Sequence, residues 1–336
     1  MGNFSNTSTC CDGALSENIP WAVTYALLAV AGSSGNLLVI YLVSSVRKLR
    51  STSNAFIVNV CAADLLVCAL WMPQQAVALA QPPPAAAPAA AYRTFAAGLF
   101  FLGLLASLFS HSLIALNRYV LITKVPAAYR DIYRRRNAAA MIASSWLAAA
   151  LLLVPWLAGQ DFARPPLGGC PRLPTFASAL SRGCFMRLGP YTATVTAVTI
   201  LGQTAVLLCA YYKILRRVQV SVKRVSVLNF QIIKSLSYPL ARKDRNSRFS
   251  VSFVVCAFIL STEPFLWVLL FGLFEPVPAL LHHLAWLLFT LLFVLSPYLY
   301  TRKNEEFRKS LRTVLGLEFS RASVAVEPGR IHAVSQ

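Results

Sequence analysis

Seven apolar stretches, separated by shorter polar segments, make up most of the chain. Each is long enough to cross the hydrocarbon core of a bilayer, which is about 30 Å thick and needs about 20 helical residues. Lipid offers no partner to an unpaired backbone group, so each spanning segment is expected to be helical. The pattern therefore predicts an all-α membrane protein, a bundle of seven transmembrane helices. Its spans are expected near residues 20–46, 54–80, 95–122, 138–158, 190–218, 249–273 and 279–301.

Composition agrees with a polytopic membrane protein and argues against a nucleic-acid-binding one. Of the 336 residues, 57% are hydrophobic and only 13% are charged, whereas a soluble domain carries about 25% charged residues. The net charge is +19, but the basic residues lie between the apolar stretches, and no zinc-finger or RNA-recognition pattern accompanies them. We expect these loops to lie against membrane lipid, and we expect no nucleic-acid partner.

The distribution of lysine and arginine predicts the orientation. Twenty-six of the 31 lie between the first and second spans, at the end of the third span and after it, between the fifth and sixth, or after the seventh. Because segments rich in these residues stay in the cytoplasm, the N-terminus is expected outside and the C-terminus inside. The chain then divides into an extracellular tail (1–19), a helical domain (20–315) and a cytoplasmic tail (316–336).

Several residues suit an extracellular environment if this orientation holds. Asn3 and Asn6 each begin an Asn-x-Ser/Thr sequon, so both are candidates for N-glycosylation. Four cysteines lie in the tail and loops placed outside, where disulfides can form. Four cysteines allow three pairings, and the sequence does not choose among them. The candidates are Cys10, Cys11, Cys170 and Cys184.

A short amphipathic helix is predicted after the last span, over residues 303–315. Its apolar residues recur at helical spacing and would share one face, while the residues between them are mostly charged. Such a helix lies on the surface of a membrane and does not cross it. The alternative is an ordinary frayed tail. The residues of the apolar face are Phe307, Leu311, Val314 and Leu315.

Motifs in six of the expected spans and in the surface helix resemble those of the rhodopsin-like (class A) G-protein-coupled receptors. They are Gly35-Asn36, Ala63-Asp64-Leu65, Asn117-Arg118-Tyr119, Trp146, Phe258 with Pro264, Ser296-Pro297-Tyr298-Leu299-Tyr300, and Phe307. Each motif is weak by itself, but their order along the chain is specific. Several further segments are similar to one orphan receptor of this family. They are residues 41–45, 52–59, 61–64, 69–74, 220–230 and 304–308.

The resemblance implies an orphan-type receptor of the plasma membrane whose helix bundle switches to activate a heterotrimeric G protein, with the inhibitory class suspected. In the family an acid usually precedes the arginine of the third helix, and here Asn117 takes that place. Asp244 is then the remaining acid that could hold Arg118, unless it is a solvated loop charge. Fewer restraints on Arg118 predict raised basal activity. The implied switch residues are Asn117, Arg118, Tyr119, Tyr211, Asp244 and Tyr300.

A ligand is expected between the helices near their extracellular ends. Phe100 stands where amine receptors carry an aspartate, so a cationic amine would lack its usual counter-ion. The candidate lining residues are aromatic and mostly neutral, which suits an apolar ligand, and ordinary helix packing is the alternative reading for each of them. Glu263 has two readings, a ligand contact or a buried neutral acid. The candidates are Trp71, Gln74, Phe100, Leu104, Glu263, Trp267, His283 and Trp286.

The resemblance also implies a sodium site, at Asp64, Ser107 and Ser296. Leu292 replaces an asparagine that the family usually has there, which weakens this expectation. A second departure concerns the outer disulfide, because Arg93 stands where the family has its cysteine in the third helix. No other metal and no cofactor are expected.

Two other classes of protein fit less well. An intramembrane enzyme needs a nucleophile and a base within reach of each other. Adjacent His282 and His283 point to different faces of a helix, and no third residue completes His111 and Ser112. We therefore expect no enzymatic activity. A transporter or channel without receptor signalling stays the alternative, although no internal repeat or charged pore supports it.

Overall fold

The computed structural model describes residues 6–80, 87–158, 190–232, 237–272, 274–275, 277–302 and 305–314. Side chains are described over 19–80, 95–158, 191–220 and most of 254–314. Within these residues the chain is helical and forms no strand. The long helices are α1 (Asn6–Ser45), α2 (Thr52–Leu66), α3 (Met72–Ala80), α4 (Ala87–Thr123), α6 (Arg135–Leu157), α7 (Pro190–Ile232), α8 (Ser237–Phe271) and α9 (Ala279–Thr301).

Seven segments of these helices are long and apolar enough to cross a membrane, which confirms the predicted bundle. They are Ile19–Ser45, Thr52–Ala80, Phe95–Thr123, Arg135–Leu157, Tyr191–Val220, Val254–Phe271 and Leu280–Thr301. The predicted boundaries lie within five residues of these. Four helices extend further than the apolar pattern indicates, because a helix can continue into less apolar sequence once it leaves the lipid. The helix α1 begins in the segment predicted as a tail, α4 begins eight residues before its predicted span, and α7 and α8 each include part of the basic stretch between them.

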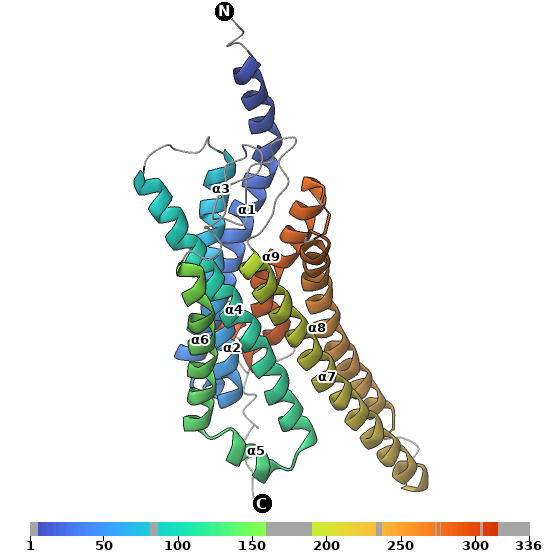
Figure 1. The fold of residues 1–336 in the computed structure, drawn as a ribbon. Coiled ribbons are helices and arrows are strands. Elements are labelled where there is room, and N and C mark those ends of the chain that lie inside the picture. The colour runs from blue at the N-terminus through green and yellow to red at the C-terminus, as the bar shows by residue number, and fades with distance from the viewer. Residues whose placement is uncertain are drawn as a thin grey trace, which may run out of the picture.

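The helix α4 lies at the centre of the bundle. It packs against α2, α6 and α7, while α1 packs against α3 and α9, and α8 lies between α7 and α9 (Figure 1). Burial follows this arrangement, since two thirds of the third span is buried, against 17% of the most hydrophobic window of the fourth. The polar side chains that α4 carries are therefore enclosed by other helices, where each needs a partner.

The second span contains a π-helical turn, η2 (Val67–Trp71), between α2 and α3. Pro73 follows two residues later. Its ring would collide with the preceding turn of a regular α-helix, and it has no amide hydrogen to donate. A π turn inserts one extra residue, which rotates everything that follows around the helix axis. Trp71 at the end of the turn is buried, and so are Gln74 and Gln75, which follow it.

Glycine allows α4 to approach α2 closely at Gly103. A Cβ atom built there would lie 3.0 Å from the carbonyl oxygen of Ala63 and 3.2 Å from Leu66 Cβ. Contacts this short are tighter than nine in ten real Cβ contacts, so alanine would require the backbone of α2 to give by a few tenths of an ångström. Small residues commonly have this role between membrane helices, because close backbone approach increases van der Waals contact.

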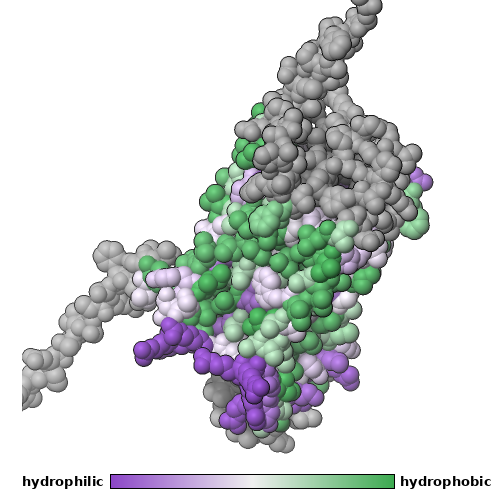
Figure 2. Space-filling model, turned by 60° about the vertical axis from the view of Figure 1, so that its left-hand side comes forward, coloured by the Kyte–Doolittle hydropathy of each residue, from purple (hydrophilic) through white to green (hydrophobic). Residues whose placement is uncertain are grey.

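One end of the bundle is polar and basic. The helices η1 (Arg47–Leu49), α5 (Pro126–Ile132) and α10 (Glu305–Val314) lie there. Figure 2 shows hydrophobic residues in a band around the side of the molecule and hydrophilic residues gathered at this lower end. We call it the basic end, the half of the bundle next to it the basic half, and the other the opposite half. Exposed basic residues here include Lys48, Arg50, Arg130, Arg134, Arg135, Arg136 and Arg308.

The helix α10 confirms the amphipathic helix predicted after the last span. Phe307 is buried against the bundle, where α10 contacts α1 and η1. Leu311 is half-buried and Val314 is exposed. The apolar face therefore attaches to the bundle at its first turn and is exposed further along, as expected of a helix that lies on a bilayer. Leu315 lies outside the described residues.

Candidate switch and ligand sites

Arg118 lies near the end of α4 in the basic half of the bundle. Its guanidinium carbon is 5.7 Å from the centre of the Tyr300 ring in α9. A cation over a ring face is attracted by the electrons of the ring. Among the side chains that the structure describes, no carboxylate comes within ion-pair distance of Arg118. Tyr211 of α7 is also buried, and its hydroxyl has no hydrogen-bond partner among the described residues.

Asn117 stands where the family usually has an acid, and its side chain is hydrogen-bonded to two other helices. Ser53 of α2 donates a hydrogen bond of 2.5 Å to its Oδ1, and its Nδ2 donates one of 3.2 Å to the hydroxyl of Tyr129 in α5. The amide therefore joins three helices through an acceptor and a donor, whereas an ionised carboxylate would have only acceptors to offer. The next aromatic residue, Tyr119, lies under the ammonium of Lys213 in α7, 5.5 Å from its ring centre.

The helix α5 is fixed to the bundle by aromatic contacts. Tyr129 stacks on Tyr133 at 5.1 Å, and Tyr133 meets Phe56 of α2 edge to face at 5.8 Å. Burial, together with neighbouring Tyr129, raises the pKa of Tyr133 to about 12. The phenol is neutral at physiological pH. Its ring contacts hold α5 against α2 at the basic end.

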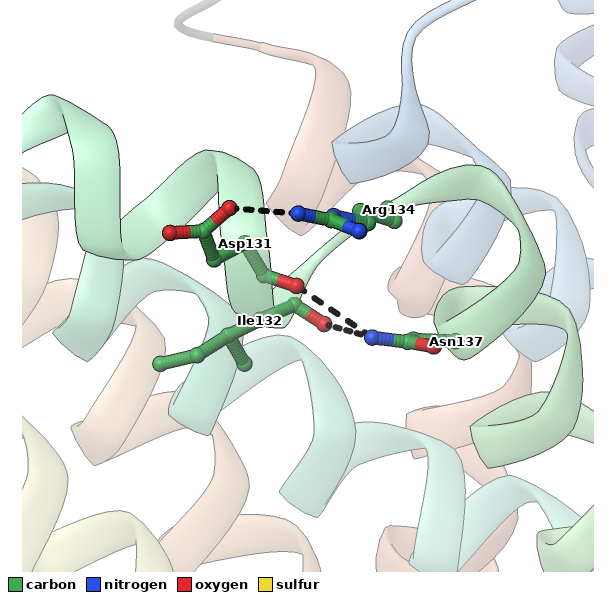
Figure 3. A network of polar contacts seen from close by, with 4 residues as sticks. All are labelled: Asp131, Ile132, Arg134 and Asn137. Carbon is green, nitrogen blue, oxygen red and sulfur yellow. Dashed lines mark hydrogen bonds and ion pairs between the residues drawn. The ribbon is translucent and has the colours of Figure 1, made fainter.

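Figure 3 shows the turn between α5 and α6. Asn137 of α6 donates from Nδ2 to the backbone carbonyls of Asp131 and Ile132, each at 3.2 Å, and Arg134 pairs with Asp131 at 2.9 Å. Both side chains of the pair are about 70% exposed, so water screens their attraction. The amide of Asn137 contributes more to the turn, because it satisfies two carbonyls that the end of α5 leaves without helical partners.

Polar contacts also join the helices at mid-bundle. Ser107 of α4 donates to Asp64 of α2 at 2.5 Å, while Ser296 of α9 donates to the carbonyl of Leu292 at 2.7 Å. All three polar residues are fully buried, and Asp64 Oδ2 has no hydrogen-bond partner. Oxygen atoms, such as those of carboxylates and hydroxyls, are the ligands that hard cations prefer. The sodium site stays a prediction, because Leu292 adds no side-chain donor.

A second group of interhelical contacts centres on Asn59. Its Nδ2 donates to Ser110 of α4 at 2.6 Å, and its Oδ1 accepts from Trp146 Nε1 of α6 at 2.7 Å. One amide therefore joins α2, α4 and α6 with both of its functional atoms. Ser110 in turn donates to the carbonyl of Ala106 at 2.6 Å. Each polar atom named here is paired, which is the usual condition for polar groups buried in a membrane bundle.

The opposite half contains a cluster of aromatic side chains, which we call the aromatic cluster: Trp71, Phe100, Phe265 and Trp286. Trp71 lies 4.4 Å from Phe100 and 5.6 Å from Trp286, and Phe265 lies 4.7 Å from Trp286, between ring centres. Leu104, one turn below Phe100, is also fully buried. The structure thus brings together four of the eight residues predicted to line a ligand site.

Buried polar atoms without a hydrogen-bond partner lie on the second and seventh spans, which carry Trp71 and Trp286 of the aromatic cluster. Buried polar groups in proteins nearly always have a hydrogen-bond partner, which is protein or ordered water, so each of these atoms is available to bond to water or to a ligand. Gln74 is among the predicted residues, whereas Gln75 and His282 were missed. Helical spacing could have found both, because Gln75 follows Trp71 by four residues and His282 precedes Trp286 by four. The unpaired atoms are Trp71 Nε1, both amide atoms of Gln74 and of Gln75, and His282 Nε2.

Three predicted ligand residues lie elsewhere. Trp267 is 55% exposed and faces outward beside Phe271. Two residues turn a helix by about 200°, and Phe265 takes the inward position. His283 packs on Trp21 of α1 at 5.4 Å. Glu263 is half-buried and accepts a hydrogen bond of 2.9 Å from Thr204 of α7. The structure does not bring these three into the aromatic cluster.

Several predicted residues fall where the structure does not describe side chains. Asn3, Cys170 and Cys184 lie outside the described residues. Four others lie in helices of which only the backbone is described there, so the disulfides, the glycosylation sites and the acid that could hold Arg118 stay predictions. The four are Asn6, Cys10 and Cys11 of α1 and Asp244 of α8.

A family model described as 7 transmembrane receptor (rhodopsin family) matches residues 35–300. The chain belongs to the rhodopsin family of seven-transmembrane receptors. The matched range includes every motif on which the resemblance rests except Phe307. In this receptor, as the helix packing shows, the helices described within the matched range form one bundle.

Curated relatives of this receptor share part of its length. G-protein coupled receptor 135 of Rattus norvegicus is 33% identical over 184 residues, which is 54% of this chain and 37% of that relative. G-protein coupled receptor 26 of Homo sapiens is 27% identical over 240 residues, 65% of this chain and 67% of the relative. G-protein coupled receptor moody of Drosophila melanogaster is 33% identical over 148 residues, 41% and 20%. The chain thus spans little more than a third of receptor 135.

Sequence reasoning about this receptor considered His111 only as a candidate catalytic residue and did not connect it with Tyr300. Its Nδ1 lies 2.6 Å from the Tyr300 hydroxyl, and both residues are buried. The residues are 189 positions apart, so no local motif connects them. The usable signal was the histidine itself, since a buried polar ring within a membrane helix needs a partner.

Proposed function

We propose that this receptor lies in the plasma membrane with its N-terminus outside and activates a heterotrimeric G protein, of the inhibitory class. The basic end then faces the cytoplasm, as the excess of lysine and arginine favours. Asn3 and Asn6 would be open to glycosylation on the other side. The observation that carries the proposal is Arg118, a cation at the basic end that lies over an aromatic ring and is paired with no described acid.

Signalling requires two arrangements of the bundle with different affinities for the G protein. Outward movement of α8 at the basic end would make room for a helix of the partner, beside α4 and α7. Arg118, Tyr211 and Tyr300 would then contact that helix. An arginine without an acid to hold it reduces the cost of this arrangement, so raised activity without ligand is expected. Asp244 of α8 is the acid that could oppose it.

The ligand of this receptor is proposed to bind at the aromatic cluster. Flat apolar groups would stack on its rings, and hydrogen-bonding groups would satisfy the unpaired atoms beside them. Those atoms belong to neutral amides, an indole and an imidazole, so the expected ligand is uncharged and aromatic, with at least one carbonyl or amide. This refines the purely apolar ligand expected from the sequence.

Ligand-free nucleotide exchange tests the proposed function. Receptor in lipid nanodiscs is mixed with purified G proteins of each class, and exchange is compared with that in empty nanodiscs. Wild type is expected to accelerate nucleotide exchange on the inhibitory class. Arg118→Ala is expected to lose at least about 90% of that acceleration, which is more than the loss of one average hydrogen bond would cause. Arg134→Ala is the control, since Arg134 is an exposed arginine at the same end. Equal exchange with wild type and with empty nanodiscs would contradict the proposal.

A further inference from the structure

His111 joins three helices of the bundle. It projects from α4, its Nδ1 is hydrogen-bonded to Tyr300 of α9 at 2.6 Å, and Phe258 of α8 packs edge-on against its ring at 5.8 Å. Its side chain is fully buried. Breaking the hydrogen bond would therefore leave two buried polar groups without their protein partners, and any movement of α9 relative to α4 must break it or carry it along.

The position of His111 relative to Arg118 gives this bond its significance. The two residues are seven positions apart on α4, which is two turns, so they share one face of the helix. Tyr300 lies along that face. Its hydroxyl meets His111, and its ring lies 5.7 Å from the guanidinium carbon of Arg118. The imidazole thus fixes the hydroxyl of Tyr300, while the ring of Tyr300 supports the guanidinium of Arg118.

We propose that His111 is a positioning residue of the switch: it holds Tyr300 against Arg118 and so favours the arrangement that binds the G protein. This inference rests on the proposed function. Its direction follows from Arg118, which in this arrangement is held by the ring and by no described acid. Breaking the bond releases Tyr300 and leaves Arg118 without that support, so signalling without ligand decreases.

Signalling variants test the effect of the bond. His111→Phe keeps a ring of similar size against Phe258 but removes both nitrogens, and Tyr300→Phe removes only the hydroxyl. Each is expected to slow ligand-free nucleotide exchange about threefold, the factor for an average hydrogen bond between membrane helices. The double variant should be no slower than either single one, because both remove the same bond. Three variants at the wild-type rate, or additive effects, would overturn the proposal.

Rescue separates the bond from packing. Asparagine carries its amide on Cγ, as histidine carries Nδ1, so His111→Asn should recover exchange above His111→Phe, whereas His111→Gln, which extends past that point, should not. Tyr298→Phe is the matched control, because Tyr298 lies on the same helix, is 51% exposed and faces away from the bundle. Its exchange rate should equal that of wild type, and an equal loss at Tyr298 would show a general effect of removing hydroxyls.

Nitrogen NMR tests the bond without any G protein. The chain has four histidines, so ¹⁵N-histidine labelling gives few signals, and His111→Asn assigns those of His111. Tyr300→Phe should shift a His111 nitrogen signal and leave the other three histidines unchanged. An unchanged His111 signal overturns the proposal whatever the exchange rates are. Wild-type exchange no faster than in empty nanodiscs would instead remove the proposed function, while the NMR signal would still report the bond.

Discussion

The two halves of the bundle differ in how far their buried polar side chains are hydrogen-bonded to one another. In the basic half, pairs and triplets of side chains from different helices satisfy one another: Asn59 with Ser110 and Trp146, Asn117 with Ser53 and Tyr129, His111 with Tyr300, and Ser112 with Gln203. The hydroxyl of Tyr211 and one nitrogen each of His111 and Gln203 are exceptions. In the opposite half, among the described side chains, an indole, an imidazole and two whole amides are unpaired beside the aromatic cluster.

This difference suits two different functions, a conformational switch and a ligand site. A paired network has few alternative arrangements, because moving one helix leaves several polar atoms unsatisfied in lipid. It suits a switch between two defined states. A buried polar group without a partner costs free energy, and a ligand that supplies the partner recovers that cost on binding. They suit a ligand site. The three predictions that follow test this comparison.

The largest expected effect is at Asn59 in the basic half. Asn59→Leu removes the hydrogen bonds to Ser110 and Trp146 and leaves the Trp146 indole nitrogen unpaired. We expect the free energy of unfolding to fall by about 1–3 kcal/mol, because two interhelical hydrogen bonds are lost and one buried donor is left unpaired. Thermal unfolding of the receptor in nanodiscs measures it. A melting temperature equal to that of wild type would mean that the paired network does not hold the basic half together.

How far the sequence could reach differs along the same division. The hydrophobic pattern predicted seven spans and the helix after them, because lipid imposes a length and a composition that can be read locally. The aromatic cluster was predicted in part, since aromatic residues near the ends of spans are visible as such. Trp267 shows the limit: it is as apolar as Trp286, and only the rotation of α8 places it outward.

The network of the basic half was less accessible to sequence reasoning. Asn117 was identified as a missing acid, but its partners Ser53 and Tyr129 come from two other helices. The helix α5, which carries Tyr129, was not predicted, because its seven residues are too few to show a hydrophobic period. Pairing across a bundle depends on helix rotation and register, and neither is encoded in a single segment.

An intermediate effect, of opposite sign in the two halves, is expected for two glutamines. Gln75→Leu in the opposite half removes two unpaired polar atoms and should raise the stability of the empty receptor by about 1 kcal/mol. Gln203→Leu, its matched control in the basic half, removes the acceptor of the Ser112 hydroxyl and should lower stability by up to about the same amount, because the unpaired Nε2 that it also removes offsets part of the loss. Thermal unfolding without ligand compares the two. Destabilisation by both variants would show that the unpaired amide is satisfied in the lipid-embedded receptor.

The smallest expected effect is at the turn between α5 and α6, at the surface of the basic end (Figure 3). Asn137→Ala frees two carbonyls of α5, but water at the surface can take them, so the loss should be about 0.5–1 kcal/mol. Asp131→Ala, which removes only the exposed ion pair with Arg134, should cost less, about 0–0.5 kcal/mol. Hydrogen exchange of α5 amides measures both. Faster exchange in Asp131→Ala than in Asn137→Ala would reverse the order and show that the ion pair, not the amide, fixes α5. The turn would then be an exception to the dependence on paired amides that Asn59 and Asn117 show deeper in the basic half.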